Sequence, residues 1–103
     1  EPLSGVAFVQ DYIELLFDGR ILRSLVPPIV VTGDLALKFP ERGFRDALCA
    51  LIGQSVANAV ANTDCRIELI FDTGSRFILN LAERIGPEAV HYVPGENEPI
   101  EVW

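Results

Sequence analysis

The apolar pattern of the first quarter of the chain predicts two β-strands joined by a tight turn. Residues 6–17 are rich in β-branched and aromatic side chains and contain neither proline nor glycine, which is typical of a strand. Asp18-Gly19 is a favoured pair for a two-residue type I′ turn, and residues 20–26 return. This register pairs Phe17 with Arg20, Leu16 with Ile21, Leu15 with Leu22, and Glu14 with Arg23. The last pair opposes an acid and a base, which favours the register.

A second hairpin echoes the first, because the string IELLFDGRIL returns as IELIFDTGSRFIL at residues 67–79. A loop centred on Thr73-Gly74 pairs Phe71 with Arg76 and Ile70 with Phe77, which is the register of the first hairpin. Two explanations are open. Hairpins demand apolar residues, glycine and aspartate wherever they occur, or the fold contains a duplicated unit whose hairpins take related places on one sheet. Under either explanation the shared residues are structural.

Further strand signals follow Pro27-Pro28, which ends the first hairpin because proline supplies no N–H to a ladder. Gly33-Asp34 suits a type II′ turn, since glycine takes its first central position. The strands on either side of this turn are apolar on both faces, so the hairpin is either covered on both faces or meets a partner. The predicted strands after the first hairpin are residues 29–32, 35–39, the helix-or-strand segment SVANAVA at 55–61, 65–71, 76–81, about 89–93, and an edge strand in the terminal IEVW.

A helical period interrupts the strands after Phe39. In the string PERGFRDALCALIG, the apolar residues recur at the spacing of one helical stripe, and they are Phe44, Leu48, Leu51 and Ile52. Pro40 suits the first turn of a helix, and Gly53 suits the left-handed position after the last turn. We therefore predict an amphipathic helix over about residues 40–53 that packs on a sheet.

The element order, with no linker or low-complexity segment, predicts one α+β domain over residues 1–103. We expect a twisted or partly rolled antiparallel sheet of about six to eight strands, built from hairpins, with the single helix packed on it. The hydrophobic share of 50% and the charged share of 22% fit a folded domain rather than a disordered chain.

Charge narrows the classes of partner. The formal net charge of -7 repels phosphate backbones and anionic membrane surfaces, which argues against nucleic-acid and membrane partners. No apolar run is long enough to span a bilayer. The start of the sequence lacks the basic head and apolar block of a signal peptide, so we expect a cytoplasmic protein. A basic protein partner and solubility alone are both open explanations of the acidic excess.

Few residues offer catalytic chemistry. His91 is the single histidine, and its apolar neighbours are typical of a structural strand histidine. Cys49 and Cys65 have no predicted base beside them to activate a thiol, and neither has the spacing of a zinc ligand. No nucleophile elbow, phosphate loop or dinucleotide fingerprint occurs. We therefore expect no catalytic residue, no metal and no cofactor, and an enzyme is the less favoured class.

The C-terminal segment carries the candidate partner-binding residues, which are Glu96, Glu98, Glu101 and Trp103. No Lys or Arg occurs from Glu88 onward, so the segment is either a solvated acidic loop or a patch that docks a basic protein. Trp103 either packs under the domain or anchors a contact, since tryptophan is enriched at interface hot spots. Edge strands offer another route, because two of them can pair across a two-fold axis.

The string LCALIGQSVANAVANTDCRIELIFDTGSRFILNL, over Leu48–Leu81, resembles a pattern in small uncharacterised bacterial α+β domains. Some of these domains are immunity-protein-like and are found beside polymorphic toxins. The resemblance covers about a third of the chain and carries over no functional residue. It implies a compact bacterial α+β domain for which toxin binding is one conceivable role.

From these observations we predict a non-catalytic protein-interaction module. An immunity-like inhibitor that binds a basic protein partner is one form of it, and a homodimer is another. The alternative is a small-ligand-binding protein or minor enzyme, with a pocket between sheet and helix near Cys49 and His91.

Overall fold

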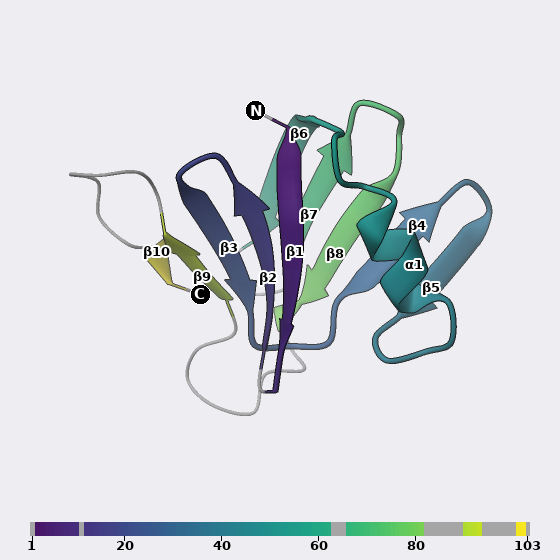
Figure 1. Cartoon of the computed structure of the whole chain (residues 1–103), viewed down its shortest axis with the longest axis horizontal. Helices are drawn as coiled ribbons and strands as arrows, with labels where there is room; N and C mark the ends of the chain where they lie inside the picture. The colour runs from purple at the N-terminus through teal and green to yellow at the C-terminus, as the bar shows by residue number, and fades with distance from the viewer. Residues whose placement is uncertain (1, 11, 63–65, 82–89, 94–100, 103) are drawn as a thin grey trace.

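The strands of the computed structural model form two five-stranded antiparallel sheets (Figure 1). The structure describes residues 2–10, 12–62, 66–81, 90–93 and 101–102. The first sheet has the order β1 (Leu3–Val9), β2 (Tyr12–Phe17), β3 (Arg20–Ser24), β9 (Val90–Val93) and β10 (Glu101–Val102). The second sheet has the order β5 (Leu35–Lys38), β4 (Ile29–Thr32), β8 (Arg76–Asn80), β7 (Arg66–Phe71) and β6 (Val56–Asn62). One short helix, α1 (Phe44–Cys49), contacts β1, β4 and β5.

The fold is dominated by its sheets, and the expectation of one antiparallel sheet is wrong because the described strands divide into two. The division occurs after β3, where the chain passes from the first sheet to the second between Ser24 and Ile29. Pro27-Pro28 lies in this connection, and proline cannot donate to a sheet ladder. Within the described part of the chain, no helix has the length and apolar character needed to cross a membrane.

Alternation along the strands turns one face of each sheet toward a shared core. From β2, Ile13 is 4% exposed and Leu15 is 0% exposed, and from β8, Phe77 is 1% exposed and Leu79 is 0% exposed. These side chains belong to one buried cluster that also includes Phe44 of α1. Because successive side chains of a strand point to opposite faces, this cluster defines the inner face of both sheets.

The helix is shorter than predicted, and three of the four residues of its predicted apolar stripe are buried. Phe44 and Leu48 are 0% exposed and Leu51 is 2% exposed, whereas Ile52 is 43% exposed. The helix begins after Gly43, whose φ of 91° is left-handed, and it ends at Cys49. Ile52 therefore lies beyond the last helical turn and does not follow the stripe. Gly53 has the predicted left-handed conformation, with φ of 96°, and Pro40 lies in a turn outside the helix.

We expect Leu48→Ala to lower the free energy of unfolding by about 2–5 kcal/mol, because it leaves a cavity among buried side chains. Ile52→Ala is the matched control, since its side chain is 43% exposed and its removal should cost no more than about 0.5 kcal/mol. Urea denaturation of both variants measures the difference. Equal losses would show that Leu48 does not anchor the helix to the core.

The register predicted for the first hairpin is confirmed, although residues 6–17 belong to two strands, β1 and β2, and not to one. Phe17 lies opposite Arg20, and Glu14 lies opposite Arg23. The guanidinium of Arg23 pairs with the Glu14 carboxylate at 2.8 Å. A two-residue loop leaves one possible pairing of the strands, which explains why the sequence was sufficient here.

The register predicted for the β7–β8 hairpin is wrong by one residue. Ile70, not Phe71, lies opposite Arg76. The Gly74 N–H donates to the Phe71 carbonyl at 2.9 Å, and the Phe71 N–H donates to the Ser75 carbonyl at 2.8 Å. Gly74 is left-handed, with φ of 91°. These bonds close a three-residue loop of the kind that ends in a glycine bulge, so Ser75 takes the position assigned to Arg76.

The two echoing hairpins occupy equivalent places in two sheets of the same plan, rather than related places on one sheet. Each sheet is a three-stranded meander, β1–β2–β3 or β6–β7–β8, extended on its last strand by a further hairpin. The first ladder breaks register between Leu3 and Gly5, and the corresponding ladder breaks between Val56 and Asn58. The shared irregularity extends the likeness beyond the hairpins themselves.

The β4–β5 hairpin forms as predicted, but it is covered on one face only. Thr32 pairs with Leu35 around the turn, and Gly33 has φ of 60°. Val30 is 0% exposed on the inner face, whereas Ala36 on the other face is exposed. The explanation that both faces are covered is therefore wrong, and the explanation that the open face meets a partner stays a prediction.

Candidate interaction surfaces

The predicted partner-binding residues fall mainly outside the described residues. Glu96, Glu98 and Trp103 lie outside them, and Glu101 is placed only as a backbone position in β10. The predicted terminal edge strand is present, because β10 is the last strand of its sheet and pairs with β9. The acidic patch stays a prediction.

The residues considered for chemistry that the structure describes lie on different elements. Cys49 is exposed at the end of α1, whereas Cys65 lies outside the described residues. His91 lies on β9, opposite Arg23 in the ladder. Within the described ranges, no group of three or more His, Cys, Asp or Glu residues is arranged to hold a metal ion.

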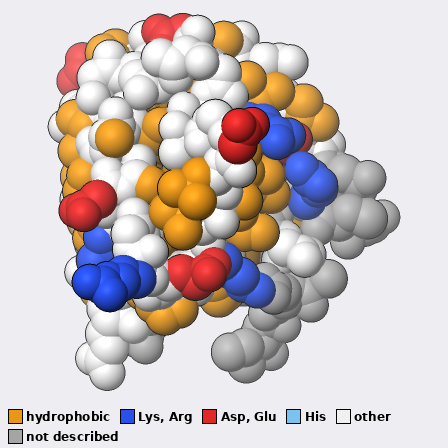
Figure 2. Space-filling view, turned by 90° about the vertical axis from the view of Figure 1, so that its right-hand side faces the viewer, with side chains coloured by type: hydrophobic (Ala, Val, Ile, Leu, Met, Phe, Trp, Pro, Cys, Tyr) orange, Lys and Arg blue, Asp and Glu red, His pale blue; other side chains and the backbone are white. Residues whose placement is uncertain are grey.

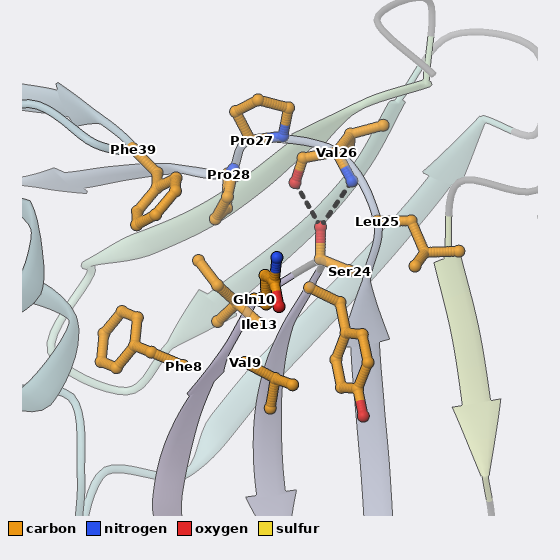
Figure 3. Close-up of a pocket in the computed structure, with 11 residues that line it drawn as sticks. Phe8, Val9, Gln10, Ile13, Ser24, Leu25, Val26, Pro27, Pro28 and Phe39 are labelled. Carbon is orange, nitrogen blue, oxygen red and sulfur yellow. Dashed lines mark hydrogen bonds between the residues drawn. The ribbon is translucent and has the colours of Figure 1, made fainter. Parts of the chain in front are cut away.

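One pocket opens at the end of the molecule where β1 turns into β2 and the chain leaves β3 (Figure 3). Its volume is about 190 Å³. Its walls come from three separate stretches, and the lining residues are Phe8, Val9, Gln10, Tyr12, Ile13, Ser24, Leu25, Val26, Pro27, Pro28 and Phe39. Phe8 and Phe39 lie together at one side, with Leu25 at the opposite side. Cys49 does not line it, so this pocket does not lie beside Cys49, where the sequence placed one.

The buried polar side chain in the pocket wall, that of Ser24, is already bonded. Ser24 is 2% exposed; its hydroxyl donates to the Val26 carbonyl at 2.6 Å and accepts from the Val26 N–H at 3.3 Å. The pocket therefore presents mainly apolar surface to a ligand. The pocket could not be predicted from the sequence, because its walls meet only after the β3–β4 connection and Phe39 fold together. The Phe39 N–H donates to the Pro28 carbonyl at 2.9 Å.

A cation packs against the two aromatic rings that line one side of the pocket. The Phe8 and Phe39 rings are stacked with centroids 6.4 Å apart. The Arg45 guanidinium carbon lies 5.5 Å from the Phe8 centroid and 5.1 Å from the Phe39 centroid, within the range of cation–π attraction. Arg45 therefore ties α1 to the rim formed by β1 and the end of β5.

The second candidate surface is the edge of β6, the last strand of the second sheet, which lies behind β1 in Figure 1. Every residue from Ala57 to Ala61 is exposed, and Val60 is 49% exposed. The strand sequence VANAVAN contains no charge and no proline. Natural edge strands usually carry such residues to prevent pairing with another chain, so β6 is an unprotected edge.

The edge strand β1 is also uncharged and seven residues long, but it differs from β6 because most of it is shielded. Its start is held by other parts of the chain: the Leu3 N–H donates to the Gln54 carbonyl at 2.8 Å, and the Gly53 N–H donates to the Leu3 carbonyl at 2.7 Å. Residues 5–7 are half-buried, with α1 in contact with this strand. Most of β1 is therefore shielded, whereas residues 57–61 of β6 are not.

Charges next to β6 are paired among themselves. Glu68 of β7 lies opposite Val60, and its carboxylate contacts Arg66 at 3.3 Å and Arg76 at 2.9 Å.

On the side of the molecule that carries α1 and the β4–β5 hairpin, Figure 2 shows acidic and basic groups scattered among hydrophobic side chains. The negative net charge is therefore not concentrated on that face.

Comparison with known proteins identifies no family for this chain. No protein-family model, no curated protein and no solved structure matches the chain. The described residues offer two surfaces that suit binding, the pocket and the β6 edge, and neither is lined by a charged side chain.

Proposed function

We propose that this protein is a non-catalytic protein-interaction module that binds through the open edge of β6. The observation that carries the proposal is the exposure of every residue from Ala57 to Ala61 in an uncharged strand. An edge strand presents a row of backbone N–H and C=O groups, and an added strand satisfies them while its side chains provide specificity.

A homodimer is one form of this function, and an immunity-like inhibitor of a basic protein is another. The resemblance over Leu48–Leu81 supports it, and this stretch contains the whole of β6. The net charge of -7 supports it as well, because opposite charges accelerate the encounter of two proteins. In this proposal charge attracts the partner, and the β6 edge binds it.

Capture from host cells tests the proposal with three forms of the protein: wild type, Val60→Lys and Leu35→Lys. Leu35 is the matched control, since it is 54% exposed on the other edge strand of the same sheet. We expect Val60→Lys to reduce recovery of a partner at least about 10-fold, because a charge on an edge opposes strand pairing, and Leu35→Lys to leave recovery unchanged. Equal recovery with both variants would remove β6 as the site.

A second candidate function, binding of a small apolar ligand, is favoured by the pocket. A cavity of about 150 Å³ can hold a benzene molecule, so the volume of about 190 Å³ suits a small aromatic molecule or a branched aliphatic group. The buried hydroxyl of Ser24 is already bonded to Val26, so an apolar ligand would not leave it without a partner.

We expect indole at millimolar concentration to raise the melting temperature of the wild type and to leave that of Val9→Trp unchanged. Val9 lies at the rim and is 43% exposed, so a larger side chain there fills the pocket without disturbing the core. A ligand that binds only the folded state stabilises it in proportion to occupancy. The same shift in both proteins would place the indole elsewhere.

A further inference from the structure

We infer that the strand that pairs with β6 is β6 of a second copy of this chain, which joins the two second sheets into one continuous ten-stranded sheet. This inference rests on the proposed function, because it uses the same β6 edge, and it assigns that edge to the homodimer form of the function rather than to a basic partner. It requires that β6 be self-complementary, that its edge groups point outward, and that the meeting surfaces carry no opposing charge.

The sequence of β6 is self-complementary. Residues 58–62 read Asn-Ala-Val-Ala-Asn, which is the same in both directions. Antiparallel pairing about a two-fold axis at Val60 therefore places Val60 opposite itself, Ala59 opposite Ala61, and Asn58 opposite Asn62 of the second copy. A two-fold interface uses the same surface of both subunits, and this strand supplies like residues at each position.

The outward direction of the edge groups follows from the Asn58 side chain. Its oxygen accepts from the N–H of Ala59 at 2.9 Å, so this N–H is directed away from the ladder with β7. Along an antiparallel strand the direction alternates by residue, so the N–H and C=O of Ala61 point outward too. The pairs Ala59–Ala61 then form two hydrogen bonds each, four in the dimer, and the Asn58 carboxamide is released to bond across the interface.

The register at Val60 is favoured over the other palindromic register, centred on Asn58, by the contacts at the start of β6. The ladder with β7 shifts register between Val56 and Asn58, so the edge is irregular there. The residues just before the strand are engaged as well, because the Gln54 carbonyl accepts from Leu3 and the Ser55 carbonyl accepts from Asp72. Residues 58–62 avoid both obstacles.

The two surfaces that meet in the proposed dimer bring no unpaired charges together. β6 has no charged residue, and the nearest acidic side chain on β7, Glu68, is paired with Arg66 and Arg76. Each copy nevertheless carries a net charge of -7, so two copies repel at long range. Salt screens this repulsion, and we expect the dimer to be tighter at 0.5 M salt than at low salt.

Pairing of five residues on each copy buries less than the roughly 1,000 Å² that a stable interface needs. We therefore expect a reversible dimer whose population depends on protein concentration. Sedimentation equilibrium over a wide concentration range measures this for the wild type, for Val60→Lys and for Leu35→Lys. The inference expects the wild type and Leu35→Lys to dimerise alike, and Val60→Lys, which opposes two ammonium groups at the axis, to weaken the dimer at least about 10-fold.

Cross-linking tests the register. Opposed residues in a non-hydrogen-bonded antiparallel pair have Cα atoms about 4.5 Å apart, which a disulfide can span. In a Cys49→Ser, Cys65→Ser background, Val60→Cys should oxidise to a covalent dimer, and Leu35→Cys should oxidise at least about 10-fold more slowly. Melting temperatures close to that of the wild type show that the variants are folded.

A wild type that stays monomeric at all concentrations, or a Val60→Cys variant that cross-links no faster than Leu35→Cys, would overturn the inference. The proposed interaction module is judged separately by capture from host cells. If Val60→Lys loses a different protein while the wild type is monomeric, the edge is an interaction site and self-pairing is wrong. If neither self-association nor capture depends on Val60, both proposals fail.

Discussion

Phe77→Ala is expected to lower the free energy of unfolding by about 3–5 kcal/mol, the usual cost of removing a buried aromatic side chain. Phe77 is 1% exposed and belongs to the cluster shared by the two sheets. It lies on β8, between Leu69 of β7 and Val30 of β4, so its loss opens a cavity in the middle of the second sheet. A domain of this size has a total stability of only about 5–15 kcal/mol.

Thermal and urea denaturation measure this effect. For a domain of about 100 residues the melting temperature should fall by about 12 °C or more. Phe8→Ala is the control, because its ring is 38% exposed at the pocket rim and its removal leaves no enclosed cavity. A loss for Phe77→Ala no larger than that for Phe8→Ala would contradict the assignment of the core.

Ser24→Ala is expected to cost about 1–3 kcal/mol, because it leaves buried backbone groups of Val26 without a partner. Ser24 is 2% exposed, and its hydroxyl bonds both the N–H and the C=O of Val26. These bonds hold the bend at which the chain leaves the first sheet. The cost is therefore expected even though the substitution removes a single oxygen atom.

Ser4→Ala provides the comparison in urea denaturation. The Ser4 hydroxyl donates to the Leu16 carbonyl at 2.8 Å, but it is exposed, so water can replace it and the loss should be within about 0.5 kcal/mol. An unchanged dependence on urea in both variants shows that the midpoint reports stability. Equal midpoints would mean that the Ser24 bonds do not support the bend.

Local features of the fold were predictable wherever a short loop limits the choices. Asp18-Gly19 gave the full register of β2 and β3. The loop at Thr73-Gly74 did not, because its residues suit both a two-residue and a three-residue turn, and only the bond from Phe71 to Ser75 decides between them. The helix was predicted too long because its apolar period continues to Ile52 after the backbone has turned away.

Long-range pairing was not predictable from the pattern. β3 pairs with β9 and β4 pairs with β8. The alternation of apolar and polar residues along one strand does not indicate which distant strand will pair with it. The division into two sheets therefore escaped prediction. So did the candidate surfaces, since the pocket forms where distant segments meet and the β6 edge is open only because no described strand pairs beyond it.

In the sequence, the strands of the second sheet all lie between β3 and β9 of the first sheet, and this order has a consequence for folding during synthesis. All five strands of the second sheet lie between residues 29 and 80, whereas the first sheet waits for β9 at residues 90–93. A chain that emerges from the ribosome N-terminus first can thus complete the second sheet while the first sheet still has three strands. We expect β6 to be able to pair with another strand before β9 joins the first sheet.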